Sequence, residues 1–382
     1  MNLYKHVAPE LIFGQGALSQ VGESATRLGA NKVFVVSDRQ VVNAGWVEKT
    51  LHYLKASGLQ YEVFCEITSN PKDSEINGGT VKYLESECDA IMSVGGGSPT
   101  DVAKSIATVA SNGGVIQDYE GINKITKPLP PMLAVPTTAG AGSEVTQFAI
   151  VVDKKRSLKM SIISKSLVPD IAIIDPEVLQ SKEARLTAAT GIDALSHAIE
   201  AYVSLAATPL TDVHALNAMR LVAGNLRQSV ACRTNMNAKL NMAIASLQAG
   251  LAFSNAILGL THAMVHQVDG YLDTHHGESN ACVLPYVMEY NLIACPGRYK
   301  DISVALGEDV TGLSIRSAAE KAIKAVFTLA GDIGLAKGLS ALGLKEELIP
   351  GLSSNAMKDA CFITNPRDAG EIDIAEIYRK AM

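Results

Sequence analysis

The stretch SVGGGSPTDVAK, residues 93–104, decides the fold, because an apolar run passes through three glycines into a segment with helical spacing. A strand that enters a helix through a tight glycine turn is typical of parallel sheets covered by helices. Apolar runs of this kind recur along the first half of the chain, at 33–38, 61–67, 90–98, 132–138 and 171–175. Amphipathic stretches separate these runs, so the sequence predicts a Rossmann-like α/β domain with a mostly parallel sheet.

The residue pattern of the sequence changes near residue 182. Long Ala- and Leu-rich segments with helical spacing follow, at 186–204, 209–231, 238–254 and 314–334. We therefore expect two domains, an α/β domain over 1–181 and an all-helical domain over 182–382. Because ligand sites form preferentially where domains meet, we expect the chemistry in the cleft between them.

The composition excludes several classes of protein. The chain has 382 residues, a net charge of −6 and no run of Lys or Arg, which argues against a nucleic-acid partner. No apolar stretch reaches about 18 residues and the first residues do not resemble a signal peptide, so we predict no membrane span. Six scattered cysteines without a C-x-x-C pair fit reduced thiols. We expect a cytoplasmic enzyme for a small molecule, assembled as a homodimer or higher homo-oligomer.

The glycine turn has the features of a phosphate site. Gly95, Gly96 and Gly97 allow close backbone approach, Ser98 adds a hydroxyl, and the following helix begins with unpaired N–H groups. By itself such a turn is also compatible with a plain tight turn. A second loop rich in Gly, Thr and Ser, PTTAGAGSE (136–144), follows another predicted strand. Asp38 ends the run VFVVSD, where a carboxylate can accept from the ribose hydroxyls of NAD, although it precedes the glycines rather than following them.

Histidines in the second half indicate a metal site. Asp193 and His197 lie four residues apart in GIDALSHAIEAY (191–202), on one face of a predicted helix. His262 and His266 have the same spacing, and His276 follows at a predicted loop or helix start. One carboxylate with three imidazoles suits a divalent first-row metal. The alternative is a capped helix in which Asp193, near the N-terminus, interacts with the helix dipole and His197 is a core residue.

Spacing alone does not decide whether His266 is a fifth ligand. A catalytic metal needs an open position for its substrate, which favours Asp193, His197, His262 and His276 as the protein ligands. An imidazole one turn away from His262 would instead handle protons or contact the cofactor. We treat the adjacent His275 as a neighbour that faces the cleft.

Several motifs together resemble one family. GGGSPTDVAK, PTTAGAGSEVT, LTAATGIDALSHAIEAY, GLTHAMVHQVDG and HGESNACVLPYVMEYN are similar to motifs of the iron-containing, group III, alcohol dehydrogenases. The likeness runs in order over nearly the whole chain, and it looks closest to the branch of propane-1,3-diol dehydrogenase, lactaldehyde reductase and methanol or ethanol dehydrogenases.

The resemblance implies a dinucleotide-binding α/β domain, a metal-binding helical domain, NAD and Fe²⁺. It implies Asp193, His197, His262 and His276 as metal ligands, with His266 beside the nicotinamide. Phe253 matches a position near the substrate. The matching cofactor positions are Asp38, Asn70, Gly96, Gly97, Ser98, Thr137, Thr138, Thr146, Lys159 and Leu179.

Three positions depart from the pattern of the family: Thr100 after GGGSP, Ala141 within the second loop, and His275 before HG. All three fall near the cofactor loops or the expected cleft, so they bear on the identity of the substrate rather than on the chemistry. For that reason His275 is a candidate substrate contact together with Phe253.

The sequence thus predicts an NAD(H)-linked, metal-dependent dehydrogenase that acts on a small primary alcohol or short aldehyde by direct hydride transfer. Two relatives of this activity stay open: a zinc-dependent enzyme similar to glycerol dehydrogenase, and a reductase of a small anionic aldehyde such as sulfoacetaldehyde. An enzyme similar to dehydroquinate synthase would need clustered Lys and Arg, which the helical motifs lack. A metal-binding protein without catalysis would leave both glycine loops and Asp38 without a role.

Overall fold

The computed structural model describes residues 5–156, 158–272, 274–335 and 338–382. These residues form two compact units. One unit is Val7–Ser181, and the other is Lys182–Met382 together with Lys5 and His6.

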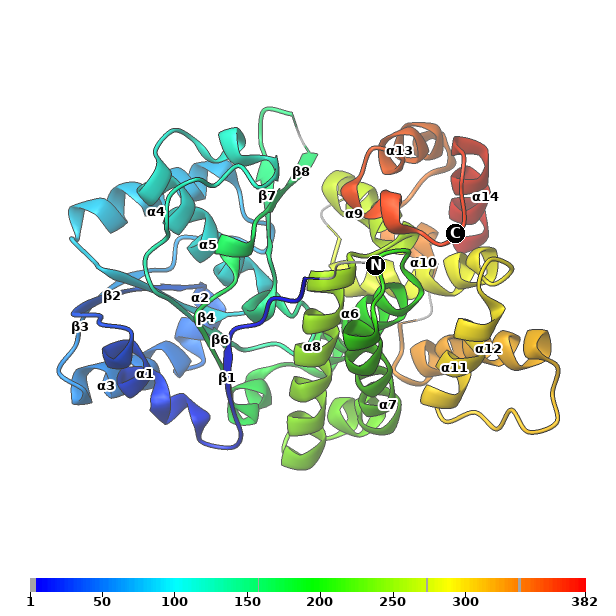
Figure 1. Ribbon diagram of the computed structural model, residues 1–382, viewed down its shortest axis with the longest axis horizontal. Coiled ribbons are helices and arrows are strands. Elements are labelled where there is room, and N and C mark those ends of the chain that lie inside the picture. Colours follow the sequence, from blue (N-terminus) through cyan, green and yellow to red (C-terminus); the bar gives the residue numbers. More distant parts are fainter. Residues whose placement is uncertain (1–4, 157, 273, 336–337) are drawn as a thin grey trace. The chain divides into compact units, whose positions relative to one another are not determined.

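A six-stranded sheet is the centre of Val7–Ser181, and its paired strands all run parallel. The strand order is β1 (Glu10–Phe13), β9 (Ile171–Ile174), β6 (Met132–Pro136), β4 (Ala90–Gly95), β2 (Lys32–Ser37) and β3 (Gln60–Phe64). Figure 1 shows α4 (Asp73–Glu85) and α5 (Gly97–Asn112) on one face, with α1 (Val21–Arg27) and α3 (Trp46–Ala56) on the other. Because helices cover both faces, β4 and β6 are buried throughout and β2 is buried except at Lys32, so these strands read as apolar runs. The predicted α/β fold is confirmed.

The structure also contains strands that the apolar runs did not predict. Besides β1, these are β5 (Gly121–Ile122), β7 (Phe148–Asp153) and β8 (Leu158–Ile163). The last three form a separate small sheet in which β7 and β8 are antiparallel. The strands β7 and β8 alternate between buried and half-buried or exposed residues, so neither gives a long apolar run.

The second unit is helical, as predicted. Its helices are α6 (Ala184–Val203), α7 (Pro209–Ala231), α8 (Met236–Ala256), α9 (Leu260–Leu272), α10 (His276–Asn291), α11 (Pro296–Ala305), α12 (Ile315–Asp332), α13 (Ile349–Ala356) and α14 (Glu371–Ala381). One core cluster joins α9 to α10, α13 and α14. In that cluster the Tyr378 hydroxyl donates to the Met264 carbonyl at 2.7 Å, which ties α14 to α9. Among the described residues no single helix is long and apolar enough to cross a membrane, and α8 with α9, bent by 103°, passes that test only as a pair.

Helix α6, which carries Asp193 and His197, is buried over most of its length. Every residue from Gly191 to Val203 is buried. Asp193 lies in the interior of this helix, well beyond its first turn, so the alternative in which it interacts with the N-terminal dipole is wrong. His276 is the first residue of α10, which confirms the predicted helix start, and His275 is its N-cap.

Candidate metal centre and nucleotide site

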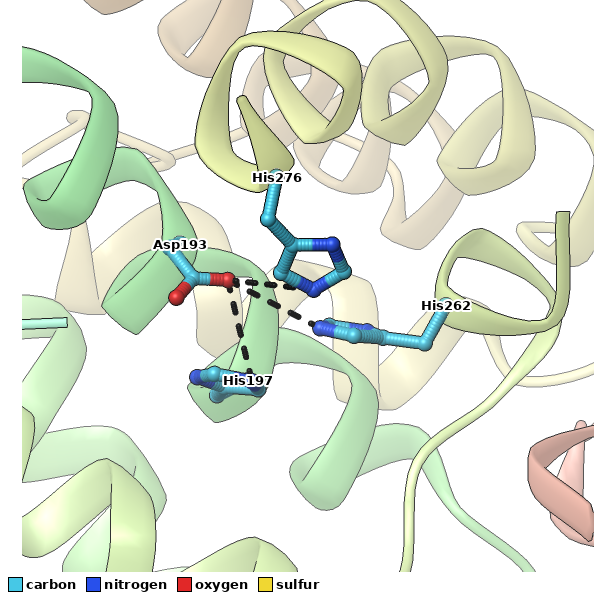
Figure 2. A group of neighbouring side chains, drawn as sticks. All are labelled: Asp193, His197, His262 and His276. Carbon is cyan, nitrogen blue, oxygen red and sulfur yellow. Dashed lines mark ion pairs between the residues drawn. The ribbon is translucent and has the colours of Figure 1, made fainter. Parts of the chain in front are cut away.

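Four side chains of the helical unit converge on one point, as Figure 2 shows. Asp193 and His197 come from α6, His262 from α9 and His276 from the start of α10. The Oδ1 atom of Asp193 lies 3.7 Å from His197 Nε2, 3.9 Å from His262 Nε2 and 3.7 Å from His276 Nε2. These separations exceed hydrogen-bond length. They are close to the spacing of about 3.4 Å between ligand atoms that share one tetrahedral cation at about 2.1 Å.

The charges of this cluster fit a cation. His262 Nε2 is buried and has no hydrogen-bond partner among the residues that the structure describes. Burial alone would raise the pKa of Asp193, but the imidazoles of His197 and His276 hold it well below its usual range. A buried carboxylate and a buried ring nitrogen without a partner are costly unless a proton or a cation lies between them. One carboxylate and three imidazoles therefore fit a divalent first-row metal.

Two carboxylates that the sequence analysis missed orient the histidines. Glu200 Oε2 lies 2.6 Å from His262 Nδ1, and Asp269 Oδ2 lies 2.6 Å from His276 Nδ1. Each contact binds the outer nitrogen of a ring and leaves Nε2 directed at Asp193. Carboxylates in this position fix the tautomer and raise the basicity of metal-binding histidines. Helical spacing could have indicated Glu200, three residues after His197 on α6, but Glu and Asp are too common on helices for spacing alone to decide.

Glu200 also anchors the start of α9. Its carboxylate accepts from the backbone N–H of Gly259 at 3.1 Å and of Thr261 at 2.6 Å. Asn365 Oδ1 accepts from the N–H of Leu260 at 3.1 Å. The first N–H groups of a helix have no partner within the helix, so these contacts complete its N-terminus and place His262.

A proton competes with a cation for His262. Burial by itself lowers the pKa of His262, but the carboxylates of Asp193 and Glu200 outweigh it and raise this pKa to about 9. Metal binding must therefore displace a proton from this ring, which makes the affinity for a metal dependent on pH.

His266 lies beside the cluster but outside the four converging side chains. Its Nδ1 atom is 2.9 Å from Asp359 Oδ2. Its ring stacks on His276 with centroids 5.6 Å apart. Phe253, the predicted substrate neighbour, stacks on His197 with centroids 4.3 Å apart and is 6% exposed. His275 is exposed, so its predicted contact with substrate stays a prediction.

Most of the predicted cofactor residues lie at the carboxyl-terminal end of the parallel sheet. Five neighbouring strands end there, and a predicted residue follows each of them. These residues are Leu179 after β9, Thr137 and Thr138 after β6, Gly96, Gly97 and Ser98 after β4, Asp38 after β2, and Asn70 after β3. Ligands of open α/β sheets bind outside the carboxyl ends of the strands, so the arrangement suits a nucleotide.

The two glycine loops at this end of the sheet contact each other. A Cβ atom at Gly96 would lie 3.1 Å from the Thr138 hydroxyl, and one at Gly97 would lie 3.1 Å from Ala141 Cβ. Gly96 is the N-cap of α5 and Gly97 its first residue, so the unpaired N–H groups of this helix begin at the contact. Asp38 caps α2 (Arg39–Asn43) through an oxygen that accepts from the Val41 N–H at 2.9 Å.

Two predicted cofactor positions lie apart from the strand ends. Lys159 is half-buried on β8. Thr146 is only 2% exposed, and its hydroxyl contacts Lys104 Nζ at 3.0 Å.

The comparisons with known proteins cover nearly the whole chain. The iron-containing alcohol dehydrogenase model matches residues 8–176, and the C-terminal model of the Fe-containing alcohol dehydrogenase family matches residues 187–382. The 1,3-propanediol dehydrogenase of Klebsiella pneumoniae is 45% identical, covering 99% of both chains. The NAD-dependent methanol dehydrogenase of Bacillus methanolicus is 42% identical, covering 98% of this chain and 99% of the relative. A solved structure of a 1,3-propanediol oxidoreductase, 45% identical, superposes over 100% of both chains with a TM-score of 0.98. The chain therefore belongs to the iron-containing alcohol dehydrogenase family, whose members include NAD-dependent oxidoreductases of small alcohols.

Proposed function

We propose that this protein catalyses reversible hydride transfer between NAD(H) and a small primary alcohol or its short-chain aldehyde. The observation that carries the proposal is the convergence of three imidazole Nε2 atoms on one buried carboxylate oxygen. A second observation supports the proposal: the predicted cofactor residues follow the carboxyl ends of five parallel strands, a place where nucleotides bind and for which a non-catalytic metal protein has no need.

In this proposal Asp193, His197, His262 and His276 hold Fe²⁺. When bound, the metal supplies a Lewis acid for the oxygen of the alcohol or aldehyde, and NAD supplies the hydride acceptor. Glu200 and Asp269 hold the outer nitrogens of His262 and His276, so the two rings keep one orientation through the reaction.

His266 is the proposed proton-handling residue. Burial alone would raise the pKa of Asp359, but the contact with His266 holds it below its usual range. Asp359 therefore stays ionised and accepts a hydrogen bond from the Nδ1–H group of His266, which leaves Nε2 of this ring to accept the proton that the alcohol releases. A carboxylate behind an imidazole also fixes the direction of the ring.

In the proposal, the loops at the carboxyl ends of the parallel strands orient the cofactor. The N–H groups at the start of α5 bind the pyrophosphate, and Asp38 accepts from the ribose hydroxyls. The Ser98 hydroxyl donates to the Ser69 carbonyl at 2.5 Å in this structure, so it joins the phosphate site only by giving up that hydrogen bond. A carboxylate at this position repels the extra phosphate of NADP, so we propose a preference for NAD.

The proposed substrate is a short, uncharged alcohol or aldehyde. Phe253 packs on the His197 ring and is almost fully buried, so the side of the metal centre that it covers is apolar. The relatives that act on 1,3-propanediol and methanol are consistent with this class.

One set of measurements tests the function and the metal together. NADH oxidation is followed with propionaldehyde, 3-hydroxypropionaldehyde, lactaldehyde and sulfoacetaldehyde, on protein whose Fe and Zn content is measured in the same sample. We expect turnover of the uncharged aldehydes in proportion to metal content. Full activity after removal of the metal by a chelator would contradict the proposal.

Zinc is the competing occupant, because an Asp and three His do not by themselves select Fe²⁺ over Zn²⁺. Reconstitution of stripped protein with each metal in turn, under anaerobic conditions, separates the two. We expect Fe²⁺ to restore more activity than Zn²⁺, and the reverse result would assign a zinc enzyme.

A further inference from the structure

Lys104 is a buried cation on α5 with an unusual set of contacts. Its side chain has no exposed surface. Nζ donates to the carbonyls of Ser143 at 2.7 Å, Thr146 at 2.9 Å and Phe148 at 2.9 Å. The Thr146 hydroxyl is a fourth acceptor at 3.0 Å, so it shares one of the three N–H groups of Nζ with a carbonyl. Every acceptor belongs to the single segment 143–148, so one ammonium group fixes the course of that segment.

The charge of Lys104 is balanced inside the same cluster. Asp101 and Glu144 are both buried, at 9% and 4% exposure. Both carboxylates interact electrostatically with Lys104. A buried ammonium group is tolerated where it is paired and hydrogen-bonded, and both conditions are met at this position.

The segment that Lys104 holds is the far end of the second glycine loop. The near end begins at Thr137, whose N–H donates to the Gly95 carbonyl at 2.9 Å. Between the two ends the loop contacts the glycine turn so closely that Gly96 and Gly97 have no room for a side chain without a shift of their neighbours. The position of this loop against the turn is therefore set at both ends, by a strand on one side and by Lys104 on the other.

Thr146 supports this interpretation. Its hydroxyl contacts Lys104 Nζ and also lies 3.3 Å from the Ser143 carbonyl, to which it can donate. Both of its polar functions are thus used, one by Lys104 on α5 and one within the loop. Because the residue is also buried, Thr146 acts on a nucleotide through the shape of the loop rather than by contact.

We propose that Lys104 is a positioning residue for the nucleotide: it holds the loop 137–147 against the glycine turn, and NAD(H) affinity depends on it although the cofactor does not reach it. The inference rests on the proposed NAD-linked activity. It adds that the strength of binding is set by a buried side chain behind the loop as well as by the residues that line it.

The test is NADH binding by the metal-loaded enzyme, measured by fluorescence titration. Lys104→Met keeps the length of the side chain and removes all the donors. We expect its Kd for NADH to rise about tenfold or more, which corresponds to the loss of charge-assisted hydrogen bonds that order the loop. The KM for NADH should rise with it, kcat at saturating NADH should change much less, and the metal content should match the wild type.

A matched control comes from the other unit. Lys239 on α8 is 1% exposed, and its Nζ donates to the Ser229 carbonyl at 3.0 Å. Lys239→Met removes an equally buried ammonium group, so it reports general loss of stability. Its Kd for NADH should stay within about twofold of the wild type. An equal rise in both variants would overturn the proposal, because the effect would then be global.

Two further variants keep the test decisive if Lys104→Met does not fold. Thr146→Val removes one acceptor and should raise Kd for NADH by about two- to fivefold. The double variant Lys104→Met/Glu144→Gln removes one buried carboxylate together with the cation, and should fold while binding NADH as weakly as Lys104→Met is expected to. Wild-type affinity in either variant would overturn the role of Lys104. Failure of the wild-type enzyme itself to bind NADH would instead overturn the proposed function.

Discussion

Among the described residues, the cluster around Lys104 in Val7–Ser181 and the cluster around Asp193 in the helical unit differ in how their polar atoms are satisfied. In Val7–Ser181, Lys104 Nζ has four oxygen acceptors and two buried carboxylates near it. In the helical unit, three imidazole Nε2 atoms face Asp193 at 3.7 to 3.9 Å. His262 Nε2, one of the three, lacks a hydrogen-bond partner within the described part of the chain.

This difference separates a structural cluster from a binding site. A buried polar group without a partner carries a desolvation penalty, so a folded protein tolerates it where a ligand will remove that penalty. The Lys104 cluster is complete by itself, and its effect on function passes through the loop that it holds. The cluster around Asp193 is complete only with a cation.

The largest effect is predicted for a variant that lacks one metal ligand of the cluster around Asp193. His262→Ala should lose the metal and reduce kcat by about a thousandfold or more, because the Lewis acid leaves with it. Metal analysis and turnover on the same sample measure both losses, and NADH binding should remain. His214→Ala changes a histidine on α7 outside the cluster and should retain metal and activity. If the His262→Ala enzyme kept its full metal content, His262 would not be a metal ligand, and the cluster around Asp193 would no longer differ from the Lys104 cluster as a binding site.

The second prediction concerns the complete cluster and pH. Burial raises the pKa of Glu144 from 4.5 to about 7. Between these values the unfolded chain releases a proton that the folded chain keeps, so the wild type loses stability as pH rises through this range. Glu144→Gln has no such loss. Its free energy of unfolding relative to the wild type should therefore increase from about pH 4.5 to 7 by up to about 3 kcal/mol, and then level off.

Urea denaturation at several pH values from 5 to 8 measures this difference. A difference between Glu144→Gln and wild type that does not change with pH would contradict this prediction, and would show that Lys104 fully compensates the charge of the buried Glu144.

The third prediction tests the supporting carboxylates of the metal centre. Glu200→Gln can keep an oxygen for the Thr261 N–H group, while an amide NH2 replaces the charged oxygen that accepts from Gly259 and contacts His262 Nδ1. Metal affinity should fall by about 10- to 100-fold, as measured by competition with a chelator. Asp269→Asn should act in the same direction at His276. Unchanged affinity in both variants would show that these carboxylates only stabilise the helices.

The smallest predicted effect sets a baseline outside both clusters. Arg316 and Glu320 form an ion pair one turn apart on α12, with side chains 80% and 54% exposed. Arg316→Ala should change the free energy of unfolding by less than about 0.5 kcal/mol, because water and salt screen such pairs. Chemical denaturation in low and high salt checks this value. If Arg316→Ala changes the free energy of unfolding by more than this, changes of similar size in variants of the buried clusters cannot be attributed to burial.

Much of the fold could be predicted from the sequence because its signals are local. The buried strands β2, β4, β6 and β9 read as apolar runs, and the long helices α6, α7 and α8 show regular helical spacing. The small sheet was missed because β7 and β8 alternate in exposure. The helix predicted over 186–204 corresponds to α6, which begins two residues earlier at Ala184, so only the alternative that placed Asp193 near the N-terminus was wrong.

The candidate metal ligands could be predicted as residue types at helical spacings, since Asp193 with His197 and His262 with His266 each mark one face of a helix. The sequence by itself thus determined the buried strands, the long helices, the ligand types and the chemistry that these allow. Only the tertiary structure decided that His262 joins Asp193 while His266 lies beside Asp359, that Glu200 stands behind His262, and that Lys104 holds the loop at 143–148. The physical reason is that each of these contacts joins segments 39 or more residues apart, whose meeting depends on how the elements pack and not on any local pattern.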